Sequence, residues 1–203
     1  MVFAEASARL ILVLHTIASV ACVGAATHLV LWLRPYRRGS FPRARAVRRF
    51  AWLSVALYAA AFIGGNLIYP TYKVRVRAQY LEDPSAVTRD AARQKEAARR
   101  VERLFGAPQP MAPEEPALAP PTEKPAQTTA KIARWFDTKE HWVALGFALA
   151  LAVAFMLAAW KPTQETKALG PVVFWLAFSS AASAWFAAIV GVVVSSFRAV
   201  GSL

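Results

Sequence analysis

Four long blocks of the chain contain no Asp, Glu, Lys or Arg, and these blocks constrain the fold more than any other feature. They are Leu10–Leu33, Phe50–Tyr69, Trp142–Trp160 and Val172–Val194. About 20 apolar residues in a helix cross the hydrocarbon core of a bilayer. In lipid, an open chain satisfies all its backbone amides only as a helix. The sequence therefore predicts an all-α integral membrane protein with four transmembrane helices.

Composition agrees with this class of protein and argues against others. Hydrophobic residues make up 57% of the chain, and the net charge is +12. Most basic residues flank the apolar blocks, which makes nucleic-acid binding a poor interpretation. The first block, at 24 residues, exceeds the apolar region of a signal peptide, so we expect a retained helix. The single cysteine, Cys22, excludes a disulfide framework.

The distribution of cations predicts an orientation. Residues 34–49 contain seven arginines and no acid, and residues 161–168 add two lysines. The positive-inside rule places both connections in the cytoplasm of a bacterial-type inner membrane. Both termini and the long loop, residues 70–140, would then be external. Lys73, Arg75 and Arg77 beside that loop oppose this orientation, but charge is densest in the short connection.

The long loop separates a first transmembrane hairpin, residues 1–69, from a second, residues 141–203. Residues 70–81 predict a short strand or the frayed end of the second span. Residues 85–105 predict a basic amphipathic helix that ends at Gly106. Its apolar stripe is Val87, Ala91, Ala98, Val101 and Phe105. Residues 107–129 contain seven of the thirteen prolines and predict an extended linker.

The residues before the third block resemble a helix start. Asp137 and Glu140 have the spacing of a capping box, and both acids favour the positive end of a helix dipole. Trp142 follows as an interfacial anchor. We therefore expect the third membrane helix to begin near Asp137.

The three histidines are the candidate cofactor ligands. His15 and His28 are about 20 Å apart along one helix, so they cannot share a metal. His15 and His141 lie 17 and 19 residues from Trp32 and Trp160, which places them within about 3 Å of one depth. This predicts bis-histidine ligation of haem b by His15 and His141. Cations for its propionates would come from Arg75, Arg77 and Lys139.

Other roles remain open for the polar residues inside the spans. His15 can simply donate a hydrogen bond to Ser179 or Ser183, and His141 can be wetted at the surface. His28 is a secondary candidate that could hydrogen-bond a carbonyl, bind a quinone oxygen, or do neither. Asn66 is another, which could hydrogen-bond a histidine or a bound ligand. The small residues Ser179, Ser183, Ala187, Gly191 and Ser195 form a ridge on the fourth span. That ridge permits close packing inside the bundle, with other membrane subunits, or in a homo-oligomer.

The stretch LHTIASVACVG, residues 14–24, resembles the first helix of two families of small membrane proteins. They are the copper-resistance D-type membrane domains and the four-helix protoporphyrinogen-oxidase-J-type proteins. The resemblance implies a haem or metal ligand at His15. A Leu-x-x-Lys element of the oxidase family has no counterpart in the third span, so oxidase activity is not implied.

Three functional hypotheses follow. The first is a b-type haem subunit for electron transfer. The second is a non-catalytic accessory subunit that holds a larger membrane complex through the ridge and the external helix. The third, copper handling, is weak because the chain has three methionines and one cysteine. The sequence contains no phosphate-binding glycine loop, HExxH, CxxC or CxxCH, which favours a protein without catalytic activity of its own.

Overall fold

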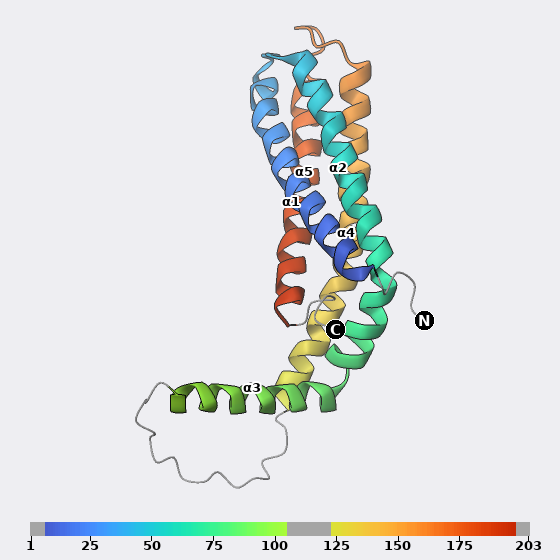
Figure 1. Ribbon diagram of the computed structural model, residues 1–203. Helices are drawn as coiled ribbons and strands as arrows, with labels where there is room; N and C mark the ends of the chain where they lie inside the picture. The colour runs from blue at the N-terminus through green and yellow to red at the C-terminus, as the bar shows by residue number, and fades with distance from the viewer. Residues whose placement is uncertain (1–6, 105–122, 198–203) are drawn as a thin grey trace.

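The computed structural model describes residues 7–104 and 123–197, and within these ranges every element is helical. Four helices lie side by side in a long bundle, and one helix lies across one end of it (Figure 1). The elements in chain order are α1 (Ala8–Leu33), η1 (Arg34–Arg38), α2 (Ala44–Thr71), η2 (Tyr72–Leu81), α3 (Pro84–Leu104), α4 (Glu123–Ala159) and α5 (Leu169–Phe197).

Four helical segments are long and apolar enough to cross a membrane: Ala8–Arg38, Ala44–Leu81, Lys131–Ala159 and Leu169–Ser196. This confirms the all-α prediction and the number of spanning-length helices in the described residues. Large apolar side chains face outward along the bundle, and Val20 and Val192 are 69% and 71% exposed. A soluble protein rarely exposes apolar patches of this extent, whereas a lipid-facing surface requires them.

The order of packing places α1 and α4 at opposite corners of the bundle. The helix α1 packs against α2 and α5, and α4 packs against the same two helices. Large apolar side chains such as Leu29, Val153 and Phe174 fill the centre. Any ligand shared by α1 and α4 would therefore cross the bundle diagonally.

Small residues bring α4 and α5 close together. The Ser180 hydroxyl donates to the Gly146 carbonyl at 2.9 Å, and the Ser183 hydroxyl donates to the Trp142 carbonyl. Ser183 and Ala187 are buried, whereas Ser179 is exposed. Much of the predicted small ridge is thus used inside this chain. Its use by another subunit stays a prediction.

The two short connections interlock at the end of the bundle that is rich in arginine. Tyr36 is fully buried, and its ring meets those of Phe41 and Trp160 edge to face. The guanidinium of Arg48 donates to the Trp160 carbonyl at 2.8 Å, and the Gln164 amide donates to the Gly39 carbonyl at 3.1 Å. This end of the bundle is consequently fixed.

The stretch after the second apolar block continues the helix of that span, so the strand alternative was wrong and the end of the span is helical rather than frayed. The helix α2 continues to Thr71, and η2 follows it as a π-helix to Leu81. The buried residues of η2 are Tyr72, Val76 and Leu81. Their spacing of four and five suits a helix wider than an α-helix. The alternation of apolar and basic side chains over residues 72–77, which suggested a strand, is therefore incidental.

The predicted helix start at Asp137 was also wrong, because α4 begins at Glu123 and passes through Asp137. Residues 123–129, which were expected to be part of the linker, are the first residues of this helix. Ile132 and Ala133 are buried against η2, so packing extends this helix beyond the apolar block. The helix α3 covers nearly the expected range. Phe105, Gly106 and residues 107–122 lie outside the described residues.

Gly146 provides a test of the close contact between α4 and α5. A Cβ on Gly146 would overlap the Tyr58 hydroxyl and lie 2.6 Å from the Ser183 hydroxyl oxygen. We expect Gly146→Ala to lower the free energy of unfolding by about 2 kcal/mol, because overpacking a filled interior forces neighbours apart. Thermal unfolding in detergent, followed by tryptophan fluorescence, measures this loss.

The matched control is Gly24→Ala in α1, where an added Cβ meets nothing within 4 Å. It should be neutral or slightly stabilising, since alanine is the better helix former. Equal melting temperatures for the two variants would contradict the packing described for Gly146.

Candidate functional site

His15 lies at the contact between α1 and α2. Its Nδ1 atom is 2.8 Å from the Ala61 carbonyl oxygen, and a Cβ on Gly64 would lie 3.2 Å from the His15 Cβ. The adjacent glycines Gly64 and Gly65 leave the space that the imidazole occupies. The hydrogen-bond partner of His15 is thus on α2, rather than the Ser179 or Ser183 side chain that the sequence suggested.

The other two histidines have exposed side chains. His141 Nδ1 is 2.9 Å from the Asp137 carbonyl oxygen, one turn earlier on α4. The His28 ring contacts Trp32 and Phe50, with centroid distances of 5.1 Å and 5.7 Å. His28 is therefore part of an aromatic cluster on the outside of the bundle. Asn66, the other secondary candidate, is exposed on α2.

The hydrogen bonds of His15 and His141 fix the same tautomer in both rings. A carbonyl oxygen only accepts, so Nδ1 carries the proton in each imidazole. The Nε2 atom is then the one with a free lone pair. Histidines that bind metals commonly donate their other ring N–H to a carbonyl in this way. Within residues 7–104 and 123–197, no group of three or more metal-binding side chains converges.

The two arginines predicted to bind propionates, Arg75 and Arg77, are on η2. Arg77 Nε donates to Glu82 at 2.7 Å, and its Nη1 is 2.9 Å from both carboxylate oxygens of Asp137. The charge of Arg77 is thus already balanced by two acids. Asp137 also accepts from His141 through its carbonyl, so one residue joins Arg77 to the candidate ligand.

The Arg77–Asp137 ion pair belongs to a larger structure, which we call the arm: η2, α3 and residues 131–137 of α4. The Tyr72 and Phe136 rings stack at a centroid distance of 3.8 Å. Val76, Leu81, Ile132 and Ala133 are buried together behind them. Aromatic stacking, apolar burial and the ion pair therefore hold η2 against α4 as one unit.

The junction between η2 and α3 is also held by side chains. The Tyr80 hydroxyl donates to Asp90 at 2.6 Å. Asp83 accepts from the hydroxyl and the backbone N–H of Ser85, at 2.8 and 2.9 Å, which caps α3. These bonds keep the pKa of the Asp83 carboxyl below its usual value, the Ser85 hydroxyl contributing most. The direction of α3 is consequently set by its first turn.

Beside this junction is a cavity of about 300 Å³ that is lined by cationic side chains from both η2 and α3. Arg75, the second predicted propionate ligand, lines it together with Arg89 and Arg93. Arg75 also approaches the Gln79 side-chain oxygen at 3.4 Å. Arg75 therefore faces α3, whereas Arg77 faces α4.

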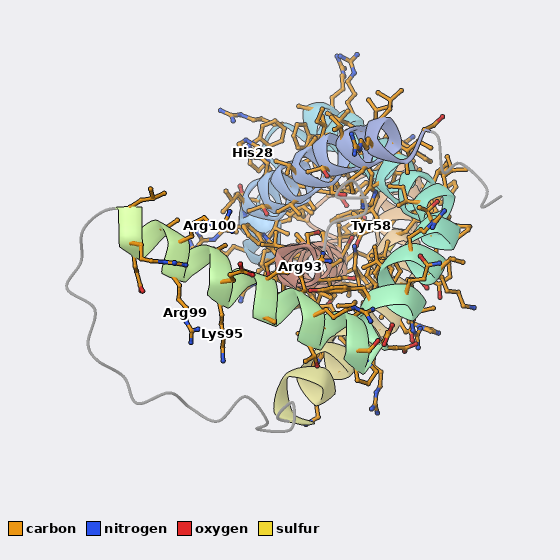
Figure 2. All side chains as sticks on the ribbon, turned by 60° about the horizontal axis from the view of Figure 1, so that its bottom comes forward. His28, Tyr58, Arg93, Lys95, Arg99 and Arg100 are labelled. Atoms are coloured by element: carbon orange, nitrogen blue, oxygen red, sulfur yellow. The ribbon has the colours of Figure 1, made fainter. Side chains whose placement is uncertain are left out.

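The exposed surface of α3 is basic. Its exposed cations include Arg93, Lys95, Arg99, Arg100 and Arg103. Figure 2 shows Lys95 and Arg99 pointing away from the bundle. Of the predicted apolar stripe, Val87 is buried and Val101 is 51% exposed; the side chains of Ala91 and Ala98 lie outside the described part. Among the described residues, α3 therefore exposes many cations and a few apolar side chains.

Lys139, also expected near the propionates, lies between helices. Its Nζ atom is 4.9 Å from the centre of the Phe136 ring. A Cβ on Gly191 of α5 would lie 3.3 Å from the same atom. The absence of a side chain at Gly191 therefore gives the lysine its space.

No protein-family model, curated protein or solved structure matches this chain. The resemblance of residues 14–24 to two haem- or copper-associated families stays a prediction. The fold itself defines the class: a helical bundle with four membrane-length helices and a braced, basic arm at one end.

Sequence reasoning missed Asp137 as the partner of Arg77. The two residues are 60 positions apart, and the sequence offered a local explanation for Asp137 as a helix cap. The available signal was the presence of acids, Asp137 and Glu140, on one flank of the long loop and of the cations Arg75 and Arg77 on the other. Because the packing of η2 against α4 cannot be read from the sequence, these charges did not indicate which acid pairs with which arginine.

Proposed function

We propose that this protein is a multi-pass membrane protein and a non-catalytic accessory subunit that presents its arm to a partner protein. The observation that carries the proposal is the bracing of the arm by Arg77, Asp137 and the Tyr72–Phe136 stack. A loop that only connects two spans does not need such an ordered structure. A docking surface does, because preorganisation reduces the entropy lost on binding.

The position of α3 supports binding to a partner protein rather than binding to the membrane surface. It begins at Pro84, after the ten residues of η2 have extended the second span. Pro84 comes 15 residues after Tyr69, the last residue of the second apolar block, which is roughly 20 Å at helical rise. Helices that bind lipid lie at the headgroup boundary instead. Its charge favours an acidic partner surface, since Arg93, Lys95 and Arg99 are exposed.

Photo-cross-linking from α3 tests the proposal. A photoreactive amino acid at Lys95, introduced in the native membrane, should give a discrete adduct with another protein. The yield should fall several-fold in high salt, because the contact is electrostatic. Arg77→Gln should also lower it by loosening the arm.

Lys161 provides the matched control, as an exposed lysine in the connection at the other end of the bundle. The same photoreactive residue there should not produce that adduct. Identical adducts from both positions, or none from Lys95 in membranes that retain all subunits, would refute the accessory role.

A second candidate function is electron transfer by haem b, with His15 and His141 as axial ligands. It is favoured by the shared tautomer, which leaves Nε2 of each ring able to bind iron. A haem there would supply one-electron redox chemistry. His15 lies against α2 whereas His141 is exposed on α4. These different environments are why we place this function second.

A reduced-minus-oxidised spectrum of protein purified from haem-replete cells tests the haem hypothesis. If haem is bound, His15→Ala and His141→Ala should each abolish the low-spin b-type bands. His28→Ala should leave them unchanged, since His28 contacts Trp32 and Phe50 away from the other two rings. A spectrum without b-type bands would remove this hypothesis.

A further inference from the structure

A hollow of about 500 Å³ lies at the arginine-rich end of the bundle, which is the end opposite the arm. It is lined by Arg34, Pro35, Arg37, Arg38 and Ser40. Within the described parts of the chain, none of the ion pairs involves these three arginines. The facing connection contributes a further cation, since Lys167 lies beside Gly39. Its one acid, Glu165, is exposed. The hollow therefore has an excess of positive charge.

The arginines are held in place by the backbone between them. Tyr36 is fully buried in the core, which anchors the short helix η1 under Arg34, Arg37 and Arg38. The turn closes through hydrogen bonds from Gly39 N–H to the Tyr36 carbonyl at 3.1 Å and from Ser40 N–H to the Pro35 carbonyl at 3.3 Å. The backbone that carries these three arginines is therefore fixed.

Arg37 is further oriented by aromatic rings of α5. Its guanidinium carbon is 4.9 Å from the centre of the Phe174 ring and 5.4 Å from that of Trp175. Stacking leaves the guanidinium edge, with its N–H donors, free to bind oxygen atoms. This geometry suits a phosphate, which arginine binds through paired hydrogen bonds.

The hollow also adjoins an apolar surface. Arg34 follows directly on Leu33, where the first apolar block ends. Leu31 on α1 is 50% exposed, and Val172 and Trp175 on α5 are 46% and 52% exposed. The two helices pack against each other. A ligand in the hollow would thus have cations around its head and apolar side chains beside it.

We propose that the hollow formed by Arg34, Arg37, Arg38 and Ser40 binds the phosphate group of an anionic phospholipid. The inference rests on the membrane insertion proposed above and is independent of any partner of the arm. Free phosphate would use the same guanidinium groups, but it would gain nothing from Leu31, Val172 and Trp175. A zwitterionic lipid would bring its choline cation into the positive field.

Native mass spectrometry of the detergent-solubilised protein tests this site. The probes are phosphatidylglycerol, phosphatidylcholine and inorganic phosphate. We expect phosphatidylglycerol adducts at low lipid concentration and few phosphatidylcholine adducts. Arg34→Gln with Arg38→Gln should weaken phosphatidylglycerol binding by about tenfold or more, since each cation near anionic lipid contributes about 1 kcal/mol.

The matched control is Arg45→Gln with Arg49→Gln, which removes the same charge from two exposed arginines at the same end. It should change binding by less than about twofold. Equal losses in the two variants would overturn the proposal in favour of diffuse attraction. Displacement of the lipid by millimolar phosphate would overturn it in favour of a free-anion site.

Two further measurements separate a failed site from a failed fold. Each variant should keep the melting temperature of the unmodified protein, because these side chains are exposed. Resistance to carbonate extraction reports membrane insertion by itself. An inserted, folded protein that does not distinguish the two lipids would refute the site and leave the proposed function untouched.

Discussion

The rest of the structure depends on one constraint, which is that charged side chains are absent from the four blocks that form the middle of the bundle. Four charge-free blocks leave the backbone one way to satisfy its polar groups in lipid, as helices. Since lipid gives no hydrophobic force between helices, small side chains must bring them together. Gly146 meets this need at the contact of α4 with Tyr58 and Ser183.

The two charged ends of the bundle are built differently. At one end, Tyr36, Arg48 and Trp160 interlock two short connections, so the arginines of η1 surround a fixed hollow. At the other end, α2 and α4 continue past their apolar blocks and carry α3 as a braced arm. We infer from this asymmetry that the first end interacts with lipid and the second with protein.

The sequence predicted the features that depend on composition and period. The four spans and the helix near residues 85–105 are of this kind, because apolar runs and helical spacing are local signals. It failed where tertiary packing changed the local preference. Residues 72–77 alternate as a strand does, yet burial of Tyr72, Val76 and Leu81 against α4 accompanies a π-helix over Tyr72–Leu81.

The candidate site was harder to predict for the same reason. The spacing of each histidine from a tryptophan gives its height along the bundle but not the direction of its ring. His15 turned out to contact Ala61, and His141 to contact the carbonyl of its own Asp137. Asp137 had the sequence signature of a helix cap, but its carboxylate binds Arg77. Such pairings depend on which helices are neighbours.

The central claim is that the bundle crosses a membrane with its arm and its arginine-rich end on opposite sides. Labelling of single cysteines in a Cys22→Ser background tests it most directly, with Lys95→Cys on the arm and Arg45→Cys in the short connection. In intact spheroplasts, a membrane-impermeant maleimide should label the first and should label the second only after permeabilisation. Labelling of both, or of neither, in intact spheroplasts would contradict the claim.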